Sequence, residues 1–276
     1  MTTIYLALLS GALALYTLSM VTGFFHLFQP RPHKTIWCKR FILAGVSLHM
    51  MAFLERCFQA RTLTVTNLHE SLSFFVLLLG LAFLLIGRKV PLPTLGAFIS
   101  PLLVIFTLWA LATTHTISPQ PPILRSFWLP LHVLLSFAGN AFLVLGCIIS
   151  VMYLLQEHLI KKKQIKGIFR NLPALQKLDE SSYLCLRCGF PLLTLGIISG
   201  SVWASFAWGS HWSWDPKETW SLITWLLFAA LLHGRMNSGW RGRKASFLTI
   251  IGFAAIMFTF LGVNLMLSGL HSYAAH

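Results

Sequence analysis

The sequence predicts an all-α, polytopic membrane protein with eight transmembrane helices and both termini on the outer (periplasmic or lumenal) side. Of its 276 residues, 56% are hydrophobic and only 10% are charged, which leaves too little polar surface to cover a soluble globule. The spacing of the apolar runs and the placement of basic residues between them support the same fold class. We expect residues 1–276 to form a single integral membrane domain.

Apolar stretches of about 20 residues, the length that crosses the hydrocarbon core of a bilayer, occur eight times. They are centred on residues 4–25, 36–54, 68–87, 94–113, 129–156, 183–202, 216–234 and 245–267. The first stretch has no basic segment before it and is too long for the apolar region of a cleavable signal peptide. We therefore expect it to be an uncleaved span.

The basic residues fall mainly on one side of these predicted spans. All but four of the 21 Lys and Arg residues lie in connections on that side, and the exceptions are Arg56, Arg61, Arg125 and Lys217. The positive-inside rule makes the basic side cytoplasmic or its equivalent. That side includes the polar segment 157–180, which we expect to be a cytoplasmic loop. The net charge of +14 thus reflects membrane topology rather than nucleic-acid binding.

Two predicted spans begin with helix-capping residues. Asn67 and Glu70 have the spacing of a capping box before the third span. Asp215, Pro216 and Glu218 combine a cap, a proline at the first helical position and a carboxylate three residues after the cap. The seventh span should therefore begin at Pro216, and capping is a better explanation of the two carboxylates than an acid/base pair.

Small residues and a cysteine pair mark the sixth span. Gly196 and Gly200 form a small-xxx-small pair, which allows another helix to approach closely. We favour helix packing over ligand contact for this pair. Cys185 and Cys188 have the spacing of a redox motif, but no second pair or nearby histidine accompanies them, so we interpret them as two inert thiols.

Residues 203–220 form a tryptophan-rich segment that we expect to face outward. Six of the ten tryptophans lie within residues 203–225: Trp203, Trp208, Trp212, Trp214, Trp220 and Trp225. An aromatic belt at the membrane interface is one interpretation. However, the first four do not share one helical face, and Gly209 interrupts a helix. A platform for a large planar ligand with polar edges is the other interpretation, and the residues alone leave both open.

Histidines at span ends are candidate ligands, because imidazole is the usual nitrogen ligand of haem iron. His132 lies at the outward end of the fifth span and His271 just beyond the outward end of the eighth, in the leaflet of the tryptophan segment. Each is also explained as a simple boundary residue. His233 ends the seventh span on the cytoplasmic side, where it could bind incoming haem or stabilise the helix C-terminus. His211, within the tryptophan segment, is a further candidate.

The pattern Trp208-Gly209, Trp212 and Trp214-Asp215 matches the signature WGxxWxWD. Together with GFPLLTLGIISGSVWA, DPKETWSLITWLLFAALLHGR and GVNLMLSGLHSY, it makes the last third of the chain resemble the WWD-domain haem-handling proteins. The segments LHVLLSFAGNA and NLHESLSFF add a weaker likeness upstream. Within the family the chain resembles the CcsA (ResC) type of the system II cytochrome c synthesis pathway, and His211 departs from the motif.

This resemblance implies a function and a set of site residues. It implies that His132 and His271 are the external axial ligands of haem b iron and that His233 belongs to a cytoplasm-facing haem entry site. The remaining haem-binding residues that it implies are Trp203, Trp208, Gly209, Trp212, Trp214 and Asp215. It implies a membrane subunit of a cytochrome c synthase, which transports haem across the membrane and presents reduced haem to the CxxCH segment of apocytochrome c. No residue is expected to act as a nucleophile, and whether this chain alone is an enzyme is left open.

The resemblance also implies partners and a location. A CcsB (ResB) type membrane protein and apocytochrome c are the expected partners, and thiol-reducing, thioredoxin-like proteins fit the same pathway. The expected location is the bacterial inner membrane or the plastid thylakoid membrane. Two alternatives stay open: a haem exporter of the CcmC type that hands haem to a separate chaperone, and a membrane regulator of haem synthesis of the HemX type.

Overall fold

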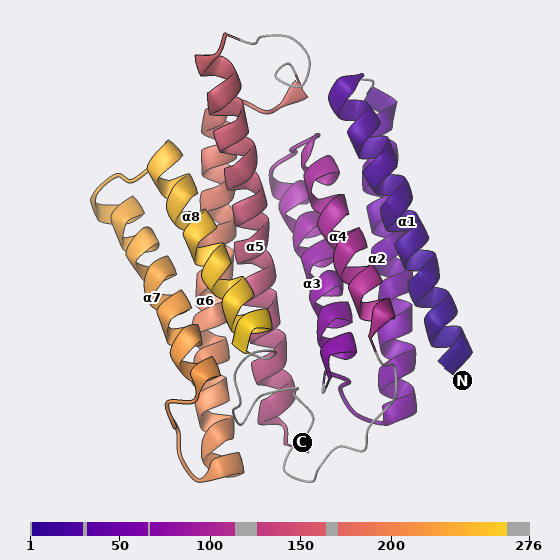
Figure 1. Ribbon diagram of the computed structural model, residues 1–276, viewed down its shortest axis with the longest axis vertical. Helices are drawn as coiled ribbons and strands as arrows, with labels where there is room; N and C mark the ends of the chain where they lie inside the picture. The colour runs from indigo at the N-terminus through magenta and orange to yellow at the C-terminus, as the bar shows by residue number, and fades with distance from the viewer. Residues whose placement is uncertain (1, 30–31, 66, 114–125, 164–170, 264–276) are drawn as a thin grey trace. The chain divides into compact units, whose positions relative to one another are not determined.

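A computed structural model describes residues 2–29, 32–65, 67–113, 126–163 and 171–263. Over these residues the regular structure is helical, as predicted (Figure 1). The helices are α1 (Thr2–Phe28), α2 (Pro32–Ala60), α3 (Leu68–Lys89), α4 (Leu95–Ala112), α5 (Trp128–Lys161), α6 (Leu175–Trp208), α7 (Pro216–Asn237), α8 (Gly242–Met257) and the π-helix η3 (Phe258–Gly262). The chain divides into two compact units: unit 1 is Met1–Ser118 with Leu155–Leu178, and unit 2 is Pro119–Leu154 with Asp179–His276.

Most of these helices can cross a membrane. Among the residues that the structure describes, seven helices are long and apolar enough to do so by length and composition. The predicted polytopic, all-α membrane protein is therefore confirmed. Helix α7 is not among the seven: it has 22 residues, enough to span, but polar residues at both of its ends, including Lys217, Glu218, His233 and Arg235, lower its hydropathy. The side of the membrane that each terminus faces stays a prediction.

The polar segment 157–180 is less of a loop than the sequence suggests. Helix α5 continues to Lys161, whose Nζ donates to Glu157 Oε1 at 2.8 Å, and α6 already begins at Leu175. An ion pair four residues apart supports helix on a polar surface. Polar composition therefore marked the end of the membrane-embedded part and not the end of the helix. The cytoplasmic position of this segment stays a prediction.

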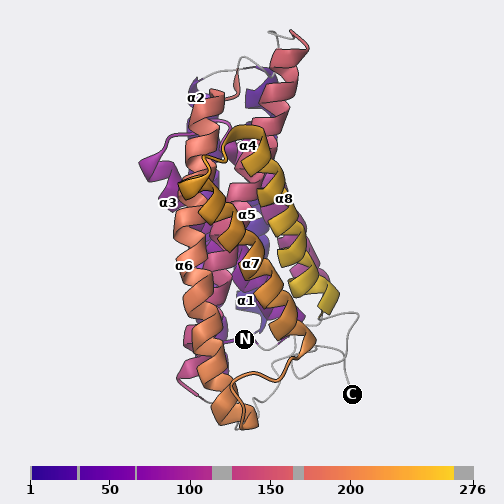
Figure 2. The ribbon, with the colours of Figure 1, turned by 90° about the vertical axis from the view of Figure 1, so that its left-hand side faces the viewer.

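Unit 1 is built on a bundle in which α1 packs against α2 and α4, and α3 packs against the same two helices (Figures 1 and 2). Glycines bring these helices close together. A Cβ atom at Gly23 would lie 2.8 Å from the Ala97 Cα, and one at Gly96 would lie 2.5 Å from the Cys38 Sγ. Both distances are shorter than van der Waals contact. The absent side chains thus allow the close helix approach that is typical of membrane bundles.

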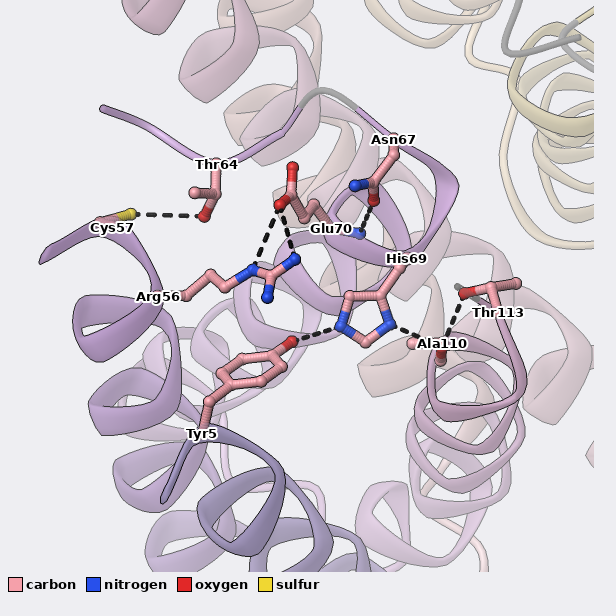
Figure 3. A network of polar contacts seen from close by, with 9 residues as sticks. All are labelled: Tyr5, Arg56, Cys57, Thr64, Asn67, His69, Glu70, Ala110 and Thr113. Atoms are coloured by element: carbon pink, nitrogen blue, oxygen red, sulfur yellow. Dashed lines mark hydrogen bonds and ion pairs between the residues drawn. The ribbon is translucent and has the colours of Figure 1, made fainter. Parts of the chain in front are cut away.

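A buried ion pair joins α2 to the start of α3 (Figure 3). Arg56 donates from Nε and Nη2 to Glu70 Oε1 at 3.2 and 3.1 Å, and the two side chains are only 2% and 3% exposed. The guanidinium also lies over the Tyr5 ring, 5.1 Å from its centroid. Asn67 Oδ1 accepts the Glu70 N–H at 2.9 Å, which confirms the predicted cap of α3. Charge, cap and cation–π contact thus converge at one corner of the bundle.

Unit 2 is held together by backbone contact between α5 and α6. A Cβ atom at Gly139 would lie 2.6 Å from the Leu193 backbone nitrogen, and one at Gly189 would lie 2.9 Å from the Gly139 oxygen. This confirms the expectation that small residues in the sixth span serve close helix packing. Trp225 of α7 then donates from Nε1 to Thr194 Oγ1 of α6 at 2.8 Å. Helix α7 packs in turn on α8.

We expect Glu70→Gln to destabilise the protein by about 3–5 kcal/mol, because it leaves the Arg56 charge buried without its counter-ion. Glu157→Gln is the matched control: its partner Lys161 is 57% exposed, so the loss should stay within about 1 kcal/mol. The free energy of unfolding of the purified chain, measured with denaturant in detergent micelles, distinguishes the two. Equal losses in the two variants would show that the Arg56–Glu70 pair contributes no more than a surface pair.

Candidate functional site

The tryptophan segment of unit 2 is a short connection with two unusual backbone positions. Gly209 (φ +76°) ends α6, and its N–H donates to Ser205 O at 3.2 Å. Trp214 has φ +58°, a left-handed conformation that is uncommon for a residue with a side chain. Ser201 Oγ of α6 donates to the His211 carbonyl at 2.8 Å. The connection is therefore folded back against α6, and its strain lies at Trp214.

The tryptophan rings form edge-to-face pairs. Trp203 and Trp208 have centroids 5.6 Å apart at an interplanar angle of 79°, and Trp212 and Trp214 are 5.9 Å apart at 85°. This is a favourable geometry for aromatic pairs. Exposure rises along the segment, from 4% at Trp203 to 70% at Trp214. The rings thus do not form the single helical stripe of a simple belt; one end of the segment is anchored and the other is presented at the surface.

The Trp212 indole adds a polar feature. Its Nε1 is buried and has no hydrogen-bond acceptor among the residues that the structure describes. A buried donor without an acceptor costs about 1–3 kcal/mol. An acceptor on a ligand or on another part of the chain would remove that cost.

The carboxylates of Asp215 and Glu218, at the turn into α7, both accept hydrogen bonds from backbone N–H groups. Asp215 Oδ1 accepts the Lys217 N–H at 2.9 Å, so α7 begins at Pro216 as predicted. Glu218 Oε2 accepts the Ser213 N–H at 2.8 Å, and not the cap residue's own N–H as a capping box requires. Both carboxylates therefore hold the backbone of the segment, and the interpretation of Asp215 as a cap is confirmed.

The π-helix η3 completes this end of unit 2. Phe258 lies 4.3 Å, centroid to centroid, from Trp220 of α7, and Phe260 packs edge-on against Phe137 of α5 at 5.7 Å. π-helical turns occur frequently at functional sites. Here the wider turn brings aromatic side chains of α5, α7 and η3 together beside the tryptophan segment.

His132 is held in one orientation by α6. Its Nδ1 lies 2.7 Å from the Gly196 carbonyl oxygen, and because a carbonyl only accepts, Nδ1 carries the hydrogen. This tautomer places the lone pair on Nε2. A Cβ atom at Gly200 would lie 2.5 Å from the same Nδ1, so the imidazole fills the space above that glycine. Because Gly196, Gly200 and Trp203 recur at helical spacing, His132 faces the stripe of α6 that carries Trp203.

The other predicted ligands are placed differently. His233 is exposed near the far end of α7, with Asn237 Nδ2 at 3.2 and 3.3 Å from its ring nitrogens. It lies 17 residues beyond Pro216, about 26 Å along the helix, so the structure does not bring it to the tryptophan segment. The neighbouring Arg235 makes a two-pronged pair with Asp179 at 2.8 and 2.9 Å. His271 lies outside the described residues.

Sequence reasoning found the two glycines of α6 but not their partner. Spacing predicts that a small-xxx-small pair packs against another helix, yet it does not say which side chain fills the gap. At Gly200 that side chain belongs to His132, and at Gly196 the neighbour is Ser136, both of α5. The one available signal was that His132 and the glycine pair are both predicted near the same end of their spans.

Taken together, the fold and the site define a helical membrane protein in which α6 leads into a tryptophan-rich connection and fixes the tautomer of a histidine of α5. The family model for the cytochrome C assembly protein matches residues 65–271, which includes both the bundle of unit 2 and this connection. The chain belongs to this family, among the CcsA-type cytochrome c biogenesis proteins.

Several relatives support this assignment. The cytochrome c biogenesis protein CcsA of Heterosigma akashiwo is 41% identical in an alignment 244 positions long that covers 76% of each chain. That of Chlamydomonas reinhardtii is 39% identical in an alignment 246 positions long that covers 84% of this chain and 67% of the relative. That of Synechococcus sp. (strain CC9605) is 36% identical in an alignment 260 positions long that covers 85% of this chain and 86% of the relative.

A solved structure has a similar fold. The cytochrome c heme lyase CcmF superposes with a TM-score of 0.70 at 21% sequence identity over 94% of this chain. The chain spans 46% of the length of that protein. At this identity the likeness concerns the fold.

We expect Asp215→Ala to destabilise the start of α7 by about 0.5–2 kcal/mol, because the Lys217 N–H loses its acceptor. Asp215→Asn keeps a side-chain oxygen at the same place and should retain most of the protection. Hydrogen exchange at the amides of residues 217–219 measures the effect, with the cap of α3 at Asn67 as an internal reference. If the Asn variant exchanged as fast as the Ala variant, charge rather than capping would be the contribution of Asp215.

Proposed function

We propose that the chain binds haem b as cargo at the tryptophan segment and presents it, reduced, to the CxxCH segment of apocytochrome c. The observation that carries the proposal is the fixed His132 imidazole beside the stripe of α6 that leads to Trp203. Membership of the cytochrome c assembly family supports the reaction class. His271 is proposed as the second axial ligand, so that two neutral imidazoles bind the iron from opposite faces.

The residues present fit a haem. An Nδ1–H donated to a carbonyl holds the imidazole ring in the orientation in which Nε2 can bind a metal. The buried Trp212 N–H is suited to a haem propionate, an acceptor of matching polarity. The edge-to-face tryptophans offer apolar ring faces and edges for a porphyrin, and the strained turn at Trp214 presents an exposed ring. Gly209 and Asp215 shape the ends of the same segment.

The proposed reaction needs placement rather than a nucleophile from this chain. In thioether formation the S–H of a cysteine adds across a haem vinyl group: the S–H bond and the C=C π bond break, and one C–S and one C–H bond form without net oxidation. A site that holds the vinyl group and excludes water contributes by orientation. We propose that a CcsB (ResB) type membrane protein completes the synthase, that thioredoxin-like proteins keep the cysteines reduced, and that the complex lies in a thylakoid or bacterial inner membrane.

His233 is proposed as part of a separate entry site on the cytoplasmic side. Its exposure suits it to capture haem. Because Arg235 is already paired with Asp179, the acceptor groups of an incoming haem would meet other basic residues of the connection that follows. Residues 235–244 contain Arg241, Arg243 and Lys244, all exposed.

The chain is purified together with its partner from haem-producing cells, and the absorption spectrum of the reduced haem is recorded. His132→Ala should remove the six-coordinate spectrum or alter it. His271→Ala should do the same, and His158→Ala, which changes an exposed histidine of α5, is the control. Haem content per protein is measured in parallel. No haem in the parent chain, or haem indifferent to both ligand variants, would contradict the proposed site. If haem is bound normally but no holocytochrome c forms, the result would instead favour the alternative function, a haem exporter that hands haem to a separate chaperone.

Gly200→Ala should reduce the haem content several-fold, because its new methyl group meets the His132 ring. Gly87→Ala is a matched control: it adds the same methyl group to a helical glycine, and no atom lies within 4 Å of it. Both variants are compared by reduced haem spectrum and by thermal unfolding. Normal haem binding in Gly200→Ala would show that the position of the imidazole does not limit ligation.

A further inference from the structure

The end of α7 that carries His233 also carries an indole fixed against the helix. Gly239 has φ +63°, a left-handed conformation that glycine adopts without strain. The Trp240 N–H donates to the Gly234 carbonyl at 3.0 Å, and a Cβ atom at Gly234 would lie 2.8 Å from Cζ3 of the same indole. Gly234 directly follows His233, about 100° further around the helix. The Trp240 ring therefore lies beside the exposed imidazole and leaves it open.

A lysine ammonium lies on this indole. Lys244, in the first turn of α8, places its Nζ 3.6 Å from the centroid of the Trp240 ring. The contact is attractive because the face of an aromatic ring is negative. It holds the ammonium next to the end of α7, while the Lys244 side chain stays exposed. A cation that is already held in place loses less side-chain freedom when it binds an anion.

The start of α8 is itself anchored, which fixes the base of this lysine. Asp179 of α6 accepts the Gly242 N–H at 2.8 Å, and a Cβ atom at Gly242 would lie 2.6 Å from the Tyr153 Oη of α5. The two oxygens of Asp179 also accept the guanidinium of Arg235. Among the described residues, the ion pairs do not include Lys244. Its charge is therefore available to a ligand.

The position of Lys244 is not explained by topology or by helix stability. The positive-inside rule accounts for basic residues on this predicted side, but not for one of them lying against an indole next to a histidine. A cation in the first turn of a helix is repelled by the helix dipole. The neighbouring Arg243 lies instead over the Phe247 ring, 5.5 Å from its centroid and one turn further along α8. Of these two basic residues, Lys244 is the one whose contact leads to α7.

We propose that Lys244, held over the Trp240 ring, binds a propionate carboxylate of the haem whose iron is ligated by His233. A haem carries its iron at the centre and both propionates at one edge, so a histidine and a neighbouring cation recognise different parts of one molecule. The ammonium and the carboxylate form a charge-assisted hydrogen bond, and the indole offers an apolar surface to the porphyrin. The proposal rests on the proposed entry site and makes that site selective for a porphyrin with charged propionates.

Haemin and its dimethyl ester, whose propionates are uncharged, test this selectivity. The full-length chain with its partner is placed in lipid nanodiscs, with His132 and His271 both changed to alanine so that the outer site is removed. Titrations followed by haem absorbance give the Kd of each compound. We expect Lys244→Gln to lower the ratio of the ester Kd to the haemin Kd about two- to fivefold, the range that an exposed ion pair supplies. Lys244→Arg should retain the ratio.

Arg243→Gln is the matched control, because it removes an exposed charge from the neighbouring residue and should leave the ratio unchanged. Thermal unfolding shows whether each variant folds. A folded Lys244→Gln variant with the parent ratio would overturn the proposal, and so would an equal fall in Arg243→Gln. His233→Ala should weaken the binding of both compounds. If it weakens neither, the entry site itself is wrong; if it weakens both while Lys244→Gln keeps the ratio, only the role of Lys244 is wrong.

Discussion

Direct contact between the backbones of α5 and α6 is the constraint on which unit 2 depends. Gly139 and Gly189 leave no room for a side chain between the helices, and the same contact continues at Gly196, which Ser136 faces, and at Gly200, where His132 occupies the space. In a bilayer, helix association gains little from the hydrophobic effect, so close van der Waals packing has a large share in fixing helix positions. The orientation of the candidate ligand is thus a product of the same packing that assembles the unit.

The two units use their polar groups in different ways. In unit 2 the shortest polar contacts of the candidate site are to the backbone, to a carbonyl oxygen at Gly196 and to N–H groups at Ser213 and Lys217. They fix the positions of side chains and of the connection. In unit 1 the buried groups contact one another's side chains, from Tyr5 to His69 and from His49 to Ser73.

The features that the sequence predicts well are those set by local chemistry. The helical spans, the caps at Asn67 and Asp215 and the start of α7 at Pro216 follow from periodicity and from the first free N–H groups of a helix. Helix α5 continues beyond the apolar stretch that ends at residue 156, as far as Lys161, because polar residues can extend a helix past an apolar run. Contacts between distant segments, such as His132 with Gly200 or Tyr5 with His69, depend on how the helices rotate about their axes, which no short motif specifies.

The Arg56–Glu70 pair also bears on how the chain enters the membrane during synthesis. An arginine near the middle of a newly made apolar hairpin is costly to insert. Its partner, however, leaves the ribosome only 14 residues later, on the next arm of the same hairpin. The two charges can neutralise each other as α2 and α3 insert, before α4 or any part of unit 2 exists.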